Sequence, residues 1–215
     1  MSLTVIPTGV FNVNSLVVPV GDGKCFVVDP AGCSLTHDEN KIVDYIKSEK
    51  LQCVEIVLTH SHFDHITGIA PVKAAFPEAS IAIHEDDYSE LTNPPGPMGT
   101  ALVRYMGFMD ILDEIKKQPD ADTPLKDGSD IFGWTVIHTP GHTPGSICLY
   151  NKEENTLISG DTIFDYGQYG RTDFPGSSYR DIMHSIQILK ERIPEGTRVF
   201  PGHDSFDFPF IPHNW

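Results

Sequence analysis

The segment from residue 59 to residue 65 holds the densest group of chemically reactive side chains in this sequence. It contains the pattern His-x-His-x-Asp-His, which begins at His60 and directly follows an apolar run. Alternate residues of an extended chain project to the same side, so His60 and His62 can reach one ion. Asp64 and His65 follow where the chain turns toward a helix, and neighbouring residues there point in different directions. The segment therefore predicts ligands for two adjacent metal positions.

Three further candidate ligands follow later apolar runs. They are His142, Asp161 and His203, and a glycine precedes each of them. Glycine lets the backbone bend and approach a ligand closely. Loops at strand ends are also where catalytic groups usually lie. We therefore expect these three side chains to lie beside the 60–65 segment and to bind the same metal ions.

The chemistry of these ligands favours a catalytic site. Neutral imidazoles with a few carboxylates suit borderline divalent ions such as Zn²⁺, Fe²⁺ or Mn²⁺. A structural zinc site would favour a closed tetrahedral set, often rich in cysteine. The four cysteines are instead scattered, with no Cys-x-x-Cys pair. Two ions that share a carboxylate can also share a water, lower its pKa and present hydroxide at neutral pH.

The elements that must position these ligands are mostly strands. Short apolar runs predict strands, and an Asp-Gly turn after the first predicts a hairpin. These strands cover residues 11–20, 24–29, 54–59, 80–84, 134–139, 146–150, 156–159 and 197–200. A capping box at 36–39, helical spacing over 66–76 and a cap at Ser178 predict three helices. The pattern indicates sheet layers covered by helices.

Two other segments have a less direct interpretation. Residues 92–107 are rich in proline and glycine, which predicts a surface loop, either a connector or part of a substrate-site rim. The acidic run 85–87 predicts a solvated helix start, favoured by the helix dipole. His84 and His138 end strands near the proposed site and are candidates for orienting its ligands.

Length and charge narrow the function classes. The 215 residues favour one domain, 1–215, and 15 Lys+Arg against 30 Asp+Glu give a formal net charge of −15. This charge argues against binding nucleic acid or an anionic membrane. No apolar run approaches the ~20 residues of a membrane span, and the N-terminus lacks the pattern of a signal peptide. With scattered cysteines that predict buried reduced thiols, we expect a cytoplasmic protein. The oligomeric state stays open.

The motifs, in their order along the chain, resemble those of the metallo-β-lactamase superfamily of metallohydrolases. This resemblance implies an α+β fold, a four-layer αββα sandwich with two metals at one end of two facing sheets. It implies that the first metal is held by His60, His62 and His142, the second by Asp64, His65 and His203, with Asp161 bridging them. Asp29 matches the family's early strand-end aspartate and would orient a metal-bound imidazole.

Particular residues narrow the resemblance. The Gly-Arg-Thr-Asp-Phe segment at 170–174 is similar to that of compact bacterial-type glyoxalase II-like hydrolases, and also to that of persulfide dioxygenases. His62 argues against the flavo-diiron oxygen reductases, which have Glu at this position. Asp161 argues against true β-lactamases, which generally lack a bridging carboxylate there. Longer glyoxalase II enzymes carry a C-terminal extension that helps hold glutathione. This chain ends 12 residues after His203, which argues against glutathione specificity but not against thioester hydrolysis.

The implied activity is hydrolysis of a small-molecule thioester such as S-lactoylglutathione by a metal-bridging hydroxide. Two divalent ions are expected, zinc first, with iron or manganese as alternatives. Asp64 would be a ligand and a proton acceptor, and Arg171 would be either a substrate contact or the partner of a carboxylate. One alternative is a mononuclear-iron persulfide dioxygenase that uses His60, His142 and Asp161. Another is a lactonase or esterase on the same dimetal scaffold.

Overall fold

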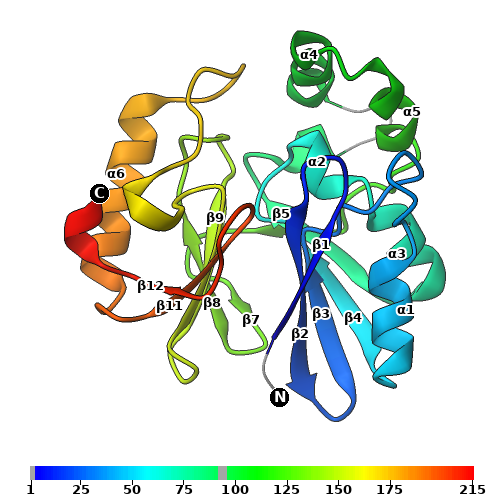
Figure 1. The fold of residues 1–215 in the computed structure, drawn as a ribbon, viewed down its shortest axis with the longest axis horizontal. Helices are drawn as coiled ribbons and strands as arrows, with labels where there is room; N and C mark the ends of the chain where they lie inside the picture. The colour runs from blue at the N-terminus through cyan, green and yellow to red at the C-terminus, as the bar shows by residue number, and fades with distance from the viewer. Residues whose placement is uncertain (1–2, 92–95) are drawn as a thin grey trace.

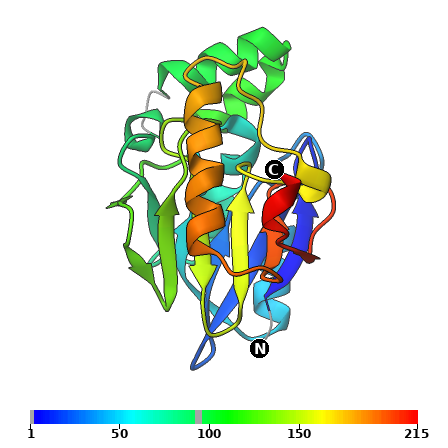
Figure 2. The same ribbon diagram turned by 90° about the vertical axis from the view of Figure 1, so that its left-hand side faces the viewer.

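Two six-stranded sheets face each other, and helices cover the outer face of each (Figure 1). The computed structural model describes residues 3–91 and 96–215. Its layers run helix, sheet, sheet, helix, so the predicted α+β sandwich is confirmed. Figure 2 shows the second outer layer, in which α6 (Tyr179–Arg192) lies along its sheet.

The first sheet has the order β1-β2-β3-β4-β5-β6. Its strands are β1 (Thr4–Thr8), β2 (Val13–Gly21), β3 (Lys24–Val28), β4 (Gln52–Val57), β5 (Ser80–His84) and β6 (Thr123–Leu125). β1, β2 and β3 are antiparallel, whereas β3, β4, β5 and β6 are parallel. The carboxyl ends of these parallel strands therefore lie at one edge, where ligands commonly bind.

The second sheet has the order β12-β11-β10-β9-β8-β7. Its strands are β7 (Asp130–Ile131), β8 (Trp134–His138), β9 (Ile147–Asn151), β10 (Thr156–Gly160), β11 (Arg198–Pro201) and β12 (Phe208–Pro209). Only β10 and β11 are parallel among its neighbours. The eight predicted strands are thus all present within a residue or two, and β1, β6, β7 and β12 were not predicted.

The remaining helices lie around the first sheet and at its upper edge (Figure 1). They are α1 (Lys41–Ser48), α2 (Phe63–Ile66), α3 (Ile69–Ala75), α4 (Pro97–Met106) and α5 (Leu112–Ile115), with the 3-10 turns η1 (Tyr88–Glu90) and η2 (Met109–Ile111). Two further 3-10 turns, η3 (Asp165–Gly167) and η4 (Pro212–Asn214), lie on the side of α6 and the second sheet (Figure 1). Among the described residues, none of these helices is long and apolar enough to cross a membrane.

Alternation along the strands explains why both faces of each sheet are apolar. In β3, Phe26 and Val28 point between the two sheets, whereas Cys25 and Val27 face the α1 and α3 layer. On the second sheet, α6 covers its own apolar cluster, which includes Ile182. Strands buried on both faces give continuous apolar runs in the sequence. All four cysteines are buried free thiols, as predicted.

Two helix predictions need correction. The capping box at 36–39 starts no helix, because the hydroxyl of Thr36 donates instead to the Cys33 carbonyl, at 3.2 Å, and to the Asp38 carboxylate. α1 begins only at Lys41. The helix predicted over 66–76 is present as α3, but it begins only at Ile69, because Gly68 packs against the backbone of Pro30 and donates to its carbonyl at 2.8 Å.

The loop predicted over residues 92–107 is also wrong in its second part. Residues 92–95 lie outside the described residues, but α4 occupies Pro97–Met106. Proline is tolerated at the first position of a helix, and Gly107 ends α4 with a left-handed φ of 77°. The carboxylate of Glu90 accepts from the N–H groups of Met98 and Gly99, at 2.9 and 3.1 Å, and so caps the helix from another element.

The central core makes a stability prediction. Phe26 is fully buried between the sheets, so Phe26→Ala should lower the free energy of unfolding by about 3–5 kcal/mol. Phe206 also packs against an aromatic ring but is 45% exposed, so Phe206→Ala should cost about 1 kcal/mol or less. Denaturant unfolding of both variants measures the difference. Equal losses would contradict the assignment of Phe26 to the central core.

Candidate metal centre

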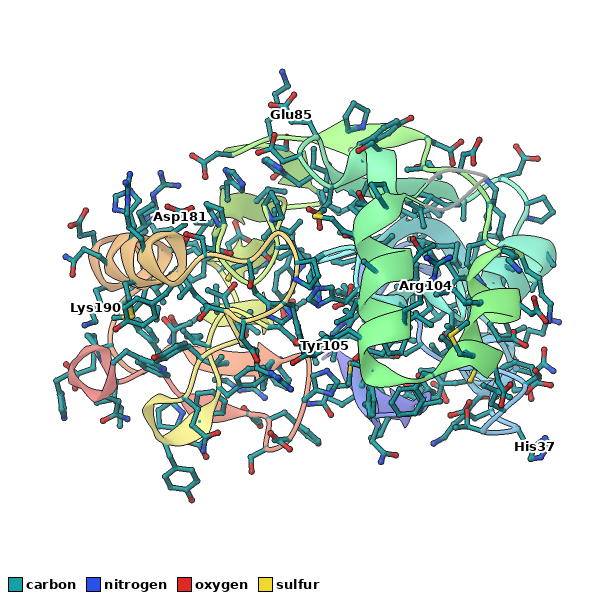
Figure 3. All side chains as sticks on the ribbon, turned by 90° about the horizontal axis from the view of Figure 1, so that it is seen from above. His37, Glu85, Arg104, Tyr105, Asp181 and Lys190 are labelled. Atoms are coloured by element: carbon teal, nitrogen blue, oxygen red, sulfur yellow. The ribbon has the colours of Figure 1, made fainter. Side chains whose placement is uncertain are left out.

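The seven candidate ligands lie together at one end of the sandwich, the end that Figure 3 views from above. The 60–65 segment leaves β4 and continues into α2. The other three follow strands of the second sheet: His142 after β8, Asp161 after β10 and His203 after β11. Strand ends from both sheets thus contribute to one site, although the ligands are up to 143 positions apart in the sequence.

Three overlapping groups of possible ligand atoms lie within the site, and one of them, Asp29 with His60 and His65, links the other two. One nitrogen from each of His60, His62 and His142 lies within 4.8 Å of the others. The second group is Asp64, His65 and His203, whose ligand atoms meet the same limit. These are the two sets that the sequence analysis proposed. Their assignment as ligands stays a prediction.

Asp161 lies between the two groups. Its Oδ2 is 3.3 Å from His142 Nε2 in the first group and 3.6 Å from His203 Nε2 in the second. Its Oδ1 is 3.6 Å from His65 Nε2. Gly202 makes this approach possible, since a Cβ there would lie 2.2 Å from Asp161 Oδ1. A carboxylate in this place can reach ions in both positions.

The outer nitrogens of four imidazoles are fixed by hydrogen bonds. His60 Nδ1 lies 3.0 Å from the Thr59 hydroxyl, and His65 Nδ1 lies 3.0 Å from the Asp29 carboxylate. His142 Nδ1 lies 2.9 Å from the Arg171 carbonyl, and His203 Nδ1 lies 3.2 Å from the Phe11 carbonyl. Carbonyl and carboxylate oxygens only accept, so Nδ1 carries the proton there. Nε2 of a neutral ring then keeps its lone pair for the centre of the site.

Unsatisfied buried atoms provide a test of whether metal ions fit here. Within residues 3–91 and 96–215, His60 Nε2, His142 Nε2 and Asp161 Oδ1 are buried without a hydrogen-bond partner. Buried polar atoms rarely lack a partner, because the lost solvation costs about 1–3 kcal/mol each. Imidazole nitrogen and carboxylate oxygen are both atom types that bind divalent metals through a lone pair. The residues present therefore fit metal ions.

The histidine pKa shifts differ between the two ligand groups. Burial, together with neighbouring imidazoles, lowers the pKa of His60 and of His62 well below the usual value, which favours neutral, ligating rings. Burial alone would raise the pKa of Asp161, but His65 and His203 hold it well below its usual value. Burial opposes charge on His65 too, yet two carboxylates, Asp161 first, raise its pKa well above the usual value. The carboxylates thus attract positive charge into the second group.

Comparison with known proteins identifies the family. The family model described as "Metallo-beta-lactamase superfamily" matches residues 8–203, which include every candidate ligand. The chain belongs to this superfamily. Its members include metal-dependent hydrolases, and this superfamily domain accounts for most of the chain.

Some curated relatives of this chain carry the names of hydrolases. A "Probable metallo-hydrolase YqgX" from Bacillus subtilis is 30% identical over 203 residues, which are 92% of this chain and 88% of the relative. The "Hydroxyacylglutathione hydrolase GloC" of Haemophilus influenzae is 25% identical over 209 residues, 96% of this chain and 92% of the relative.

Two solved structures are similar over nearly their whole length. "BLEG-1 B3 metallo-beta-lactamase" has a TM-score of 0.80 and 29% identity, covering 96% of this chain and 93% of its own. "TTHA1623 in a di-iron-bound form" has a TM-score of 0.77 and 28% identity, covering 98% and 96%. The likeness agrees with the αββα fold of the superfamily.

Asp29 contacts the site as the sequence analysis expected of an orienting residue. Besides holding His65, its carboxylate accepts from the Thr59 N–H at 2.7 Å and from the Thr59 hydroxyl at 2.6 Å. Thr59 in turn contacts His60 Nδ1. One buried carboxylate thus supports an imidazole of each group, which is consistent with an orienting role.

Asp87 is a residue of the site that the sequence analysis missed. The run 85–87 is not a uniformly solvated helix start, because Asp87 is fully buried. Its carboxylate accepts from Ser61 N–H at 2.9 Å, Gly145 N–H at 2.7 Å and the Thr143 hydroxyl at 2.8 Å. It therefore joins the loop of His60 and His62 to the loop of His142. Its position just after β5, at the ligand edge of the parallel strands, was the available signal.

His84 and His138 lie beside this support and form a separate group with Asp86, in which one possible ligand atom of each residue lies within 4.8 Å of the others. Their rings stack with centroids 3.8 Å apart. His84 Nδ1 accepts from the Asp86 N–H at 3.3 Å, and His138 Nε2 donates to the Pro144 carbonyl at 2.9 Å. Hydrogen bonds thus use one nitrogen of each ring, and the pair connects β5 to the loop of His142.

A cavity of about 390 Å³ opens onto the metal centre, and five of the seven candidate ligands line it. Arg171 also lines this cavity. Its guanidinium donates to Asp173 through Nε at 2.9 Å and Nη2 at 2.6 Å, and lies 4.2 Å above the Phe174 ring. The carboxylate pairing expected as one alternative for Arg171 is therefore present. Its contact with substrate stays a prediction.

The position of Asp87 predicts an effect on metal retention. Asp87→Ala should weaken metal binding at the His60, His62 and His142 position about tenfold or more, because outer partners fix ligand orientation. The neighbouring Asp86→Ala, which removes an exposed carboxylate, should retain the metal of the parent protein. Zinc content after dialysis against a chelator, and cobalt(II) absorption spectra of the substituted proteins, measure this. Equal retention in both variants would show that Asp87 does not position the ligands.

Proposed function

We propose that this chain is a dinuclear metal-dependent hydrolase that cleaves a thioester, with S-lactoylglutathione as the reference substrate. The observation that carries the proposal is the position of Asp161, within 3.6 Å of imidazoles from both ligand groups. A buried carboxylate between two sets of nitrogen ligands favours two adjacent ions over one. The cavity beside these ligands gives a small substrate access to both positions.

The reaction needs water as its only co-reactant. The carbon–sulfur bond breaks, the water oxygen joins the acyl carbon, and the products are a carboxylic acid and a thiol. Two bound divalent ions supply a Lewis acid for the carbonyl and a water of lowered pKa. The thiol is a good leaving group because thiols are far more acidic than alcohols.

The chain's own residues take the remaining roles. Asp64 would bind an ion and accept a proton, and its position in the cavity lining, with Oδ2 3.3 Å from His203 Nε2, supports both roles. Asp29 keeps His65 in the tautomer that presents Nε2. These positions support the roles expected from the sequence.

The relatives support the proposal at two points. GloC carries the name of a hydroxyacylglutathione hydrolase and matches 96% of this chain. TTHA1623 is described in a di-iron-bound form and matches 98% of it. We keep zinc as the first choice of metal, with iron as the alternative that TTHA1623 suggests and manganese as a third.

Metal analysis with parallel assays tests the proposal. The purified protein should hold close to two divalent ions per chain and should cleave S-lactoylglutathione, with hydrolysis lost on chelation and restored by added metal. Glutathione persulfide with oxygen uptake, a lactone and a chromogenic β-lactam complete the panel. One iron per chain with oxygen uptake on persulfide would instead identify a dioxygenase that uses His60, His142 and Asp161.

The second ligand group makes a separate prediction. His65→Ala should reduce the metal content from about two ions to about one and lower thioester kcat by at least about a hundredfold. His184→Ala on the exposed side of α6 changes the same residue type far from the site and is the control. Near-parental hydrolysis by a one-metal His65→Ala protein would show that the reaction needs a single ion.

A further inference from the structure

The cavity wall beside the metal centre is largely apolar. Besides the candidate ligands, its apolar part is formed by Phe11, Leu102, Met106, Phe164 and Phe174, and Gln168, Tyr169, Gly170, Arg171 and Asp204 complete the lining. Phe174 lies against the ligand rings, with centroids 5.8 Å from His62 and 6.5 Å from His142. A group bound at the metals would therefore contact aromatic and aliphatic carbon within its first few atoms.

Helix α4 supplies one side of this wall. Leu102 and Met106 lie one turn apart and face the cavity together. Tyr105 extends the apolar surface outward, with its ring 6.1 Å from that of Phe174. Figure 3 shows Tyr105 on the side of α4 that faces the half of the molecule containing α6.

The charge at the cavity mouth does not favour an anionic ligand. Among the described residues that line the cavity, Arg171 is the only lysine or arginine. The Arg171 guanidinium forms a bidentate ion pair with Asp173 and lies 4.2 Å from the centroid of the Phe174 ring. Asp204 adds a carboxylate to the lining. An anionic group would have to displace Asp173 before it gained a cationic partner.

Glutathione thioesters carry two carboxylates that such a mouth does not match. An apolar acyl chain, in contrast, would gain free energy from each carbon that it buries against this wall. From these observations, and resting on the function proposed above, we infer that the preferred substrate is a thioester with an apolar acyl group and an uncharged thiol portion.

An acyl-length series tests this inference directly. Acetyl, butyryl, hexanoyl and octanoyl thioesters of N-acetylcysteamine keep the leaving group constant. We expect kcat/KM to rise about threefold for each CH₂ added until the wall is covered. Hexanoyl-N-acetylcysteamine should also exceed S-hexanoylglutathione, which has the same acyl group, by about tenfold or more.

Variants of two methionines locate the effect. Met106→Glu places a charge in the wall and should remove most of the dependence on chain length. Met109→Glu, three residues on, is the matched control, since Met109 is 51% exposed and does not line the cavity. Circular dichroism and metal content of both variants confirm that fold and ions are retained.

Asp173→Asn tests the charge argument from the other side. Releasing Arg171 from its ion pair should raise kcat/KM for S-hexanoylglutathione severalfold, with little change for the uncharged thioester. A flat chain-length series, or a tenfold preference of the parent enzyme for S-hexanoylglutathione, would overturn the inference and leave thioester hydrolysis standing. Failure to cleave any thioester with two ions bound would instead overturn the proposed function.

Discussion

The structure depends on gathering five imidazoles, four of them buried, and two buried carboxylates at one end of an apolar sandwich. His60 and His65 are at most 1% exposed, and Asp161 is 9% exposed. Polar groups buried in this way cost free energy unless they bind a partner, and charged groups cost more. Three of their atoms lack any hydrogen bond among the described residues. The buried side chains of the site therefore suit cation binding, and the surrounding structure holds them in place.

Two buried carboxylates distribute that support between the sheets. Asp29, after β3, fixes Thr59 and His65 within the first sheet. Asp87, after β5, reaches across to Thr143 and Gly145 in the loop of the second sheet. Both accept from backbone N–H groups and hydroxyls, Asp29 also accepts from the His65 imidazole, and neither contributes a ligand of the proposed sets. The distance between the two sheets at this end is consequently set by hydrogen bonds as well as by core packing.

Sequence reasoning succeeded where spacing and local chemistry decide the outcome. The His-x-His-x-Asp-His segment and the three Gly-preceded ligands could be recognised because strand ends and turn residues leave local patterns. It failed where a distant residue decides. Glu90 caps α4, and Asp38 accepts from the distant Gly9 in the segment that was expected to begin a helix. Asp87 is buried although the two residues before it are not. Such contacts form only when the whole chain has folded.

The net charge of −15 and the apolar cavity wall would affect a substrate over different distances. Surface charges more than about 8–10 Å away are largely screened at physiological salt, so they do not decide which group contacts the metals. The wall formed by α4 and Phe174 acts at contact distance and selects by shape and polarity. The proposed hydrolysis would turn the acyl group into a carboxylate in a cavity whose lining contains Asp204 and one guanidinium, Arg171, that is already paired. For a hydrolase of apolar thioesters, the same mouth that gives no advantage to an anionic substrate also favours release of the anionic product.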